Sequence, residues 1–181
     1  MRTRRSFLAQ SLAAATAPAL LGQSSKGTRR VCVIGHTGRG NFGHGLDVVW
    51  NLLEETSIVA VADANAGGLA KAKKKLGVDE AYADYREMLQ KEKPDLVAVC
   101  PRHVDQRVPM ITAACEAGAQ GIYVEKPFVR SPEEGDQIAK ACAKAGTKLA
   151  VAHRNRYHPV LPVLKKLLAD GLIGEVLELR G

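Results

Sequence analysis

From about residue 30 onward, short apolar runs alternate with segments whose apolar residues recur at helical spacing. The apolar runs stand at 31–34, 58–62, 96–100, 122–124 and 149–152. Short unbroken runs of this kind are typical of strands that are buried on both faces. The chain is therefore expected to contain a mostly parallel sheet with helices between its strands.

Helical periodicity fills the intervals between these runs. Helices are expected at about 46–53, 66–76, 84–92, 104–115, 132–145 and 160–168. Leu46, Val49, Trp50 and Leu53 form the apolar stripe of the first of these helices. The segment Ser131-Pro132-Glu133-Glu134 is a capping box with proline at the first helical position, so it predicts a helix start.

The pattern changes near the carboxyl end of the chain. Residues 175–180 alternate polar and apolar side chains, which is typical of a half-exposed strand. The predicted fold class is α/β, a doubly wound mostly parallel sheet over 29–155. Residues 156–181 are expected to supply a linking helix and only the first strand of a second, α+β domain.

Composition excludes several classes of protein. Of 181 residues, 46% are hydrophobic and 25% charged, which argues against a disordered chain. The net charge is +7, but Arg2, Arg4 and Arg5 supply three of these charges. The remainder is spread out except for lysines in 71–75, with no aromatic side chains between them for base stacking. We therefore expect no nucleic-acid partner.

The first 25 residues have the pattern of an export signal, in which a basic start precedes a short apolar stretch and small residues. The segment Arg4-Arg5-Ser6-Phe7-Leu8 resembles a twin-arginine signal. The protein is thus expected to use the twin-arginine export machinery and to be periplasmic. Two alternatives remain for this segment: an uncleaved signal that anchors the protein to the membrane, and a plain amphipathic helix.

The four cysteines show no C-x-x-C spacing. A zinc site or a redox dithiol is therefore not indicated, and no metal is expected. Each cysteine falls in a predicted strand or on an apolar helix face, where a free thiol behaves as a small hydrophobe.

A glycine-rich loop follows the first predicted strand over 35–43. Glycines let backbone N–H groups approach a pyrophosphate at the start of a helix. A G-x-G-x-x-G frame that begins at Gly35 places Thr37 at the second glycine, whereas a frame from Gly38 has the right spacing but begins three residues late. A plain tight turn is the alternative interpretation.

Asp63 ends the second predicted strand, 28 residues (63 − 35) after Gly35. A carboxylate at this point accepts hydrogen bonds from a ribose 2′-OH and repels a 2′-phosphate, which favours NAD over NADP. The alternative is a helix cap with no ligand.

The sequence Glu125-Lys126-Pro127 follows the strand at 122–124, and Pro101 follows the strand at 96–100. Together with the loop, Asp63 and the segments 156–159 and 171–176, these residues resemble the Gfo/Idh/MocA oxidoreductase family over about 29–181. That resemblance implies a dinucleotide-binding Rossmann domain at 29–155.

The resemblance also implies roles for single residues. Gly35, Gly38 and Gly40, with Thr37 and Arg39 of the same loop, would hold the pyrophosphate. Asp63 would hold the adenosine ribose, Pro101 would line the cofactor cleft and Glu125 would lie near the nicotinamide. Lys126 would be the catalytic lysine, although a solvent lysine before a turn proline is the alternative. The five histidines are treated as local residues, and the family's downstream histidine is not in this chain.

These observations predict an exported NAD-dependent oxidoreductase that acts on a sugar, a polyol or a similar hydroxylated substrate. Two alternatives remain open. One is an NAD-dependent glycoside hydrolase of the same fold that oxidises its substrate transiently, and the other is a nucleotide-binding module without catalysis. The sequence also leaves open a homo-oligomer and whether the chain is a fragment. Residues 1–181 alone are expected to bind the dinucleotide but to show little or no turnover, because the wall that would hold the substrate against the nicotinamide is not among them.

Overall fold

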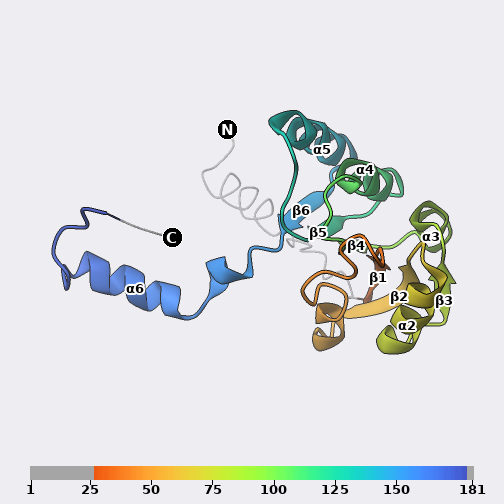
Figure 1. Ribbon diagram of the computed structural model, residues 1–181, viewed down its shortest axis with the longest axis horizontal. Helices are drawn as coiled ribbons and strands as arrows, with labels where there is room; N and C mark the ends of the chain where they lie inside the picture. The colour runs from red at the N-terminus through yellow and green to blue at the C-terminus, as the bar shows by residue number, and fades with distance from the viewer. Residues whose placement is uncertain (1–26, 179–181) are drawn as a thin grey trace, which may run out of the picture.

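The computed structural model describes residues 27–178 and contains one six-stranded parallel sheet (Figure 1). Its strands are β1 (Arg29–Ile34), β2 (Thr56–Ala62), β3 (Glu80–Tyr82), β4 (Leu96–Val99), β5 (Gly121–Val124) and β6 (Lys148–Val151). Their spatial order is β3-β2-β1-β4-β5-β6, and each neighbouring pair is parallel. This order confirms the predicted doubly wound α/β fold.

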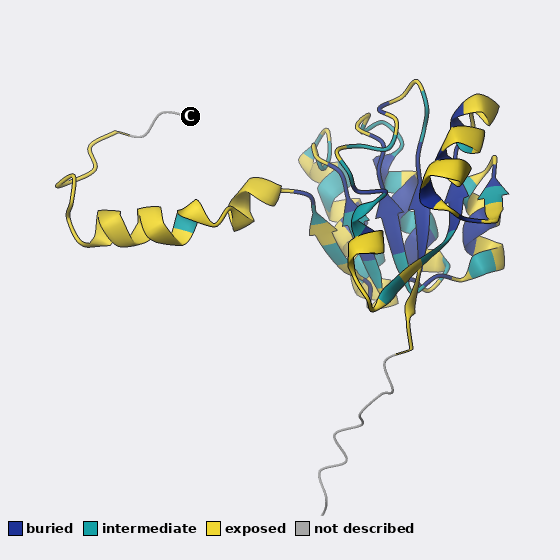
Figure 2. Ribbon diagram, turned by 90° about the horizontal axis from the view of Figure 1, so that it is seen from below, coloured by how far each residue is buried: buried dark blue, intermediate teal, exposed yellow. Residues whose placement is uncertain are grey.

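Helices cover both faces of the sheet. They are α2 (Ala66–Leu76), α3 (Tyr85–Glu92), α4 (Arg107–Glu116) and α5 (Pro132–Ala145), with a short 3₁₀ helix η1 (Val49–Leu52). Apolar side chains of α3, α4 and α5 pack in one core cluster, and those of η1 and α2 pack in the other. Alternate residues of β1 enter the two clusters, so this strand is buried on both sides (Figure 2).

The helix starts and stops follow the sequence signals. Asn65, Asp84 and Ser131 cap α2, α3 and α5 with side-chain oxygens. Gly77 and Gly146 end α2 and α5 in the left-handed conformation. The predicted capping box is formed in part: Ser131 Oγ accepts from the backbone N–H of Glu134, whereas the Glu134 carboxylate accepts from the backbone N–H of Arg130 rather than from that of Ser131.

The α-helix expected at 46–53 does not form, so this prediction is wrong. Only η1 forms there, because Gly43 and Gly45 adopt φ values of 67° and 91° that interrupt a helix from its start. Leu46 and Trp50 are nevertheless buried, so the apolar stripe identified core residues but not the right element. The three-residue β3 was not expected, and α4 begins at Arg107, after Val104.

The strand expected at 175–180 is not found over its described residues, so this prediction is also corrected. Residues 175–178 form no strand, and 179–181 lie outside the described residues. A strand needs a hydrogen-bonded neighbour, and no described strand pairs with this segment. The preceding helix α6 (Val160–Ala169) forms as expected but extends away from the sheet (Figures 1 and 2).

The predicted export signal lies outside the described residues. Over 27–178, no helix has the length and apolar character needed to cross a membrane. In the same range no group of three or more histidine, cysteine or acidic side chains is arranged to hold a metal ion. All four cysteines are free thiols, and the Sγ atoms of Cys115 and Cys142 are 3.8 Å apart.

Candidate functional site

The carboxyl ends of the parallel strands bring the predicted site residues to one edge of the sheet. Ile34 of β1 is in register with Ala62 of β2 and Val99 of β4, and Val99 is in register with Val124 of β5. The glycine loop, Asp63, Pro101 and Glu125 therefore all follow strands that end together. Ligands of doubly wound sheets bind at this edge.

The glycine loop depends on backbone conformations that favour glycine. Gly38 and Gly40 have φ values of 84° and 96°. A Cβ at Gly40 would lie 2.2 Å from the backbone nitrogen of Arg102, which shows how closely the loop approaches the segment after β4. A Cβ at Gly38 would meet no atom within 4 Å, so this residue faces open space.

Thr37 and Asp63 join the loop to the end of β2. The backbone N–H of Thr37 donates to both carboxylate oxygens of Asp63 at 3.0 Å, and the Thr37 hydroxyl donates to Oδ2 at 2.6 Å. The N–H of Asn65 donates to Oδ1 at 2.9 Å, and Asp63 is 1% exposed. Asp63 therefore holds the loop in place, a role that the sequence analysis did not assign to it.

A cavity of about 260 Å³ lies beside this contact and is lined by Gly35, His36, Asp63, Asp84 and Tyr85, among others. A strand-end carboxylate, a glycine loop with open space above Gly38 and an adjacent cavity are the features that the adenosine half of a dinucleotide requires. The residues present therefore fit NAD, with Gly35 and Asp63 at the wall of the same cavity.

Arg39 points to a different partner from the one expected. Its guanidinium forms an ion pair with Asp105, in the segment between β4 and α4. His36 of the same loop meets Gln106 through Nδ1 and Oε1 at 3.1 Å. These contacts link the glycine loop to the start of α4, so Arg39 is engaged within the protein.

Pro101 is buried, and its carbonyl accepts a hydrogen bond from the side chain of Arg107 at 2.9 Å. The same guanidinium donates to the carbonyls of Pro127 at 3.3 Å and Val99 at 3.4 Å. Arg107 is 1% exposed, and burial lowers its pKa, an effect that the negative charge of Glu125 opposes. Arg107 thus connects the ends of β4 and β5, and the sequence analysis missed it.

Glu125 is a buried carboxylate at the end of β5, with 1% of its surface exposed. Its Oε2 accepts from the backbone N–H of His44 at 2.7 Å and lies 3.0 Å from His44 Nδ1. Its Oε1 accepts from the backbone N–H of Lys126 at 2.9 Å. Three donors around one buried carboxylate fix the turn that carries Lys126 against the loop that carries His44.

Gly43 makes this approach possible. Its φ is 67°, and a Cβ there would lie 2.5 Å from Oε2 of Glu125 and 2.7 Å from the carbonyl oxygen of Cys100. A larger residue at this position would displace the loop from Glu125. The glycine thus has a packing role in addition to its conformational one.

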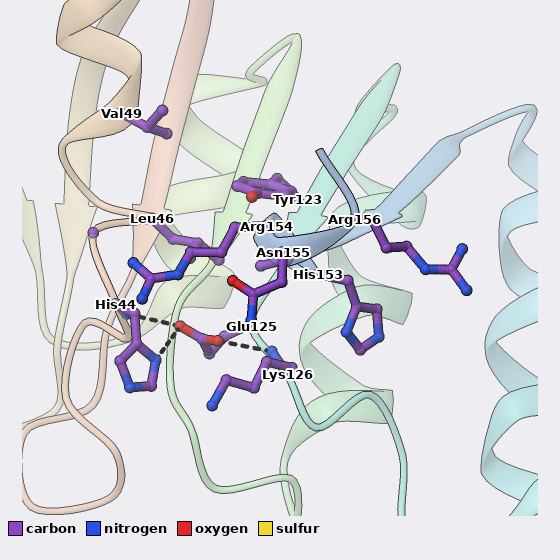
Figure 3. Close-up of a pocket in the computed structure, with 12 residues that line it drawn as sticks. His44, Leu46, Val49, Tyr123, Glu125, Lys126, His153, Arg154, Asn155 and Arg156 are labelled. Carbon is purple, nitrogen blue, oxygen red and sulfur yellow. Dashed lines mark hydrogen bonds and ion pairs between the residues drawn. The ribbon is translucent and has the colours of Figure 1, made fainter. Parts of the chain in front are cut away.

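Lys126 opens onto a cavity of about 710 Å³ on the other side of the site (Figure 3). Val49 and Tyr123 line its apolar part, whereas His44, Arg154 and Asn155 line its polar part with Lys126. Burial raises the pKa of Tyr123, and the charge of Glu125 adds to this effect.

The structure therefore divides the predicted residues into two groups. Gly35 and Asp63 line the smaller cavity, with Thr37 bound to Asp63, and Glu125 and Lys126 line the larger one. His44 was treated as a local residue, but it lines the larger cavity and contacts Glu125. Nothing in the sequence between them indicates a contact over 81 positions.

Comparisons with known proteins agree with this geometry. Residues 29–153 match the Gfo/Idh/MocA family, described as an oxidoreductase family with an NAD-binding Rossmann fold. A D-apiose dehydrogenase of Paraburkholderia graminis is 30% identical over 125 residues, which are 69% of this chain and 33% of that relative. A levoglucosan dehydrogenase of Pseudarthrobacter phenanthrenivorans is 31% identical over 67% of this chain and 30% of that relative.

Among solved structures, the myo-inositol 2-dehydrogenase of Lactobacillus plantarum superposes with a TM-score of 0.68 and 27% identity. The match covers 82% of this chain and 43% of that one. The chain thus spans about a third of the curated relatives that it matches. The family match over 29–153 shows that the chain belongs to the Gfo/Idh/MocA oxidoreductases and carries their NAD-binding Rossmann domain.

Proposed function

We propose that the protein is an NAD-dependent oxidoreductase that transfers a hydride between nicotinamide and a carbinol carbon of a sugar, a polyol or a similar hydroxylated substrate. The observation that carries this proposal is the position of Lys126. The buried Glu125 holds its backbone at the carboxyl edge of the sheet, and Lys126 lines the 710 Å³ cavity. The relatives named above, which include dehydrogenases of apiose, levoglucosan and inositol, support the same substrate class.

Residues of the smaller cavity and the loop would hold the cofactor. Gly38 is the loop glycine that faces open space, so a pyrophosphate would approach the backbone there, whereas a Cβ at Gly35 or Gly40 would meet Phe42 or Arg102. Asp63 would hold the adenosine ribose at the wall of the smaller cavity, and to accept from its hydroxyl it would give up one of its hydrogen bonds from Thr37 or Asn65. Because Thr37 donates to both oxygens of Asp63, the loop and the ribose site form one unit. Glu125 and Pro101 would shape the wall on the nicotinamide side.

Lys126 would act on the substrate hydroxyl. Bound NAD supplies the hydride acceptor, so oxidation of a carbinol removes the C–H hydride and the hydroxyl proton and leaves a carbonyl. An ammonium group stabilises the alkoxide charge that develops on the oxygen, and a partner is needed for the departing proton. The Lys126 side chain is exposed to the cavity and makes no ion pair among residues 27–178, so it is available for this role.

The test is turnover with a panel of sugars and polyols, measured as NADH formation by residues 1–181 and by a longer form that carries a substrate domain, with Lys126→Ala made in the longer form. We expect Lys126→Ala to lose about 10²-fold or more of the rate with nearly unchanged NAD affinity, because proton transfer and charge stabilisation are of this size. Equal rates with lysine and with alanine at position 126 would contradict the role of Lys126. Release of an aglycone without net NADH formation would instead support the glycoside hydrolase, and NAD binding without any turnover by the longer form would support the non-catalytic module.

We also propose that the protein is exported through the twin-arginine machinery and works in the periplasm. The support is the Arg4-Arg5-Ser6-Phe7-Leu8 segment before a short apolar stretch. As that pathway is generally understood, it moves folded proteins, so a cofactor that stays bound could be carried through with the protein.

A further inference from the structure

We propose that the larger cavity takes a substrate that carries a negative charge, a sugar or polyol with a carboxylate or a phosphate group. The proposal rests on the proposed function, because it names the substrate class for the same site. It is carried by an excess of positive side chains around the cavity.

Three cationic side chains line the cavity. They are Lys126 after β5, and Arg154 and Arg156 in the 3₁₀ helix η2 (Arg154–Tyr157) that follows β6. None of the three forms an ion pair with an acidic side chain among residues 27–178. Their charges are therefore not cancelled by any direct partner in that part of the chain.

Glu125 is the one acidic residue in the cavity lining, and it is turned to the protein. Its side chain is buried. Oε2 contacts the backbone N–H and the ring Nδ1 of His44, and Oε1 accepts from the backbone N–H of Lys126. Behind it, the buried guanidinium of Arg107 interacts with its charge. The three cations Lys126, Arg154 and Arg156 therefore outnumber the single carboxylate of the lining.

The donors also converge. Figure 3 shows the Arg154 guanidinium and the Asn155 amide extending over Glu125, with Lys126 and His44 on the same side of the cavity. His44 contacts Glu125 through Nδ1, so Nε2 is the ring nitrogen that this contact leaves available. Arg156 points away from these four side chains, so it contributes only to the positive electrostatic potential of the cavity.

The cavity matches a charged substrate in size and composition. Its volume of about 710 Å³ lies within the range of small-molecule sites. Guanidinium and ammonium groups bind carboxylate and phosphate oxygens with charge-assisted hydrogen bonds, and an Asn amide binds hydroxyls. A neutral sugar would add no charge to the site, whereas the anionic group of an acidic sugar would pair with these exposed cations.

The test is a titration of the isotope-labelled 181-residue chain, followed by NMR at the backbone amides of His44, Lys126 and Asn155. The probes are D-glucuronate, glucose 6-phosphate and D-glucose, each at the same ionic strength. We expect saturable shifts with one or both acidic sugars and about tenfold or weaker binding of glucose. The two acidic probes distinguish a carboxylate from a phosphate as the recognised group.

Variants make the result specific. Arg154→Ala is expected to weaken binding of the acidic probe about tenfold or more, whereas Lys144→Ala, which removes an exposed cation of α5, is expected to leave it unchanged. Three results would overturn the proposal. The first is equal binding of glucose and glucuronate with no binding of glucose 6-phosphate, the second is equal shifts from sodium chloride alone, and the third is unchanged binding of the acidic probe by Arg154→Ala. A separate NAD titration of the same sample tests the proposed function, so loss of NAD binding with retained binding of the acidic sugar would separate the two.

Discussion

His44 and Glu125 meet through two hydrogen bonds to one carboxylate oxygen, from the backbone N–H at 2.7 Å and through Nδ1 at 3.0 Å. The two residues come from different elements, the loop after β1 and the end of β5. The carboxylate is buried and also holds the N–H of Lys126. One side chain thus sets the relative position of the cofactor loop and the proposed catalytic lysine.

The first prediction concerns Glu125→Gln. An amide offers an acceptor on one side only, so either the His44 or the Lys126 N–H loses its partner in a buried position. We expect the free energy of unfolding to fall by about 1–3 kcal/mol, the cost of an unsatisfied buried group. Urea denaturation measures it, with Glu54→Gln on the exposed surface as the control. Equal midpoints for the two variants would show that the carboxylate does not organise the site.

The second prediction concerns Gly43→Ala. Gly43 and Gly118 both have positive φ, but a Cβ at Gly43 would lie 2.5 Å from Glu125 Oε2, whereas one at Gly118 would meet nothing within 4 Å. Gly118→Ala should cost about 1 kcal/mol for the backbone conformation alone. Gly43→Ala should cost roughly 1–3 kcal/mol more, because the loop must move, and should also weaken NAD binding. If both variants unfold at the same urea concentration, the close approach has no energetic weight.

The third prediction concerns alkaline pH. The Tyr82 hydroxyl donates to Glu92 Oε1 at 2.7 Å, and this hydrogen bond, with burial and the nearby negative charges, raises the pKa of Tyr82. The folded state therefore holds this proton more tightly than the unfolded state, whose tyrosine pKa is about 10. Its stabilising contribution is complete below that pH and is lost as pH rises towards the folded pKa.

Tyr82→Phe removes this contribution. Denaturation at several pH values from about 8 to 11 should show the stability difference between the protein and the variant shrinking as pH rises. A difference that grows with pH would reverse the assigned sign. The other raised groups, which include Tyr85 and Cys100, are common to both proteins and cancel in the comparison.

The fourth prediction concerns export. Replacing Arg4 and Arg5 together by lysine keeps the charge but removes the guanidinium geometry, so we expect the protein to stay in the cytoplasm. Arg2→Lys, outside the pair, serves as the matched control. Cell fractionation measures the distribution, and periplasmic protein from the double variant would exclude a twin-arginine signal.

Much of the fold followed from the sequence because buried parallel strands are continuous apolar runs, as at 31–34 and 96–99. The cap at Ser131 was an equally local signal. The region 46–53 failed because an apolar stripe reports which residues are buried and not which backbone presents them. There, the positive φ of Gly43 and Gly45 decided the backbone.

The site was predicted less completely. Asp63 and Lys126 stand directly after strands, where topology alone places ligand contacts. The role of His44 depends on its contact with Glu125, which is 81 positions away, and the role of Arg107 depends in part on the carbonyl of Pro127, which is 20 positions away. Such pairs become visible only when the strand order is known.

The fifth and most direct test is calorimetric titration of the protein with NAD and with NADP, repeated with Asp63→Ala and with the exposed Asp79→Ala as the control. We predict saturable NAD binding that is tighter than NADP binding. Asp63→Ala should weaken the binding of NAD by roughly 1–3 kcal/mol and reduce the difference in affinity between NAD and NADP, because it removes a charged acceptor and the group that holds Thr37. Asp79→Ala should change neither affinity. Absence of NAD binding, or equal affinities for the two cofactors in the unaltered protein, would contradict the assignment of this edge of the sheet as an NAD site governed by Asp63.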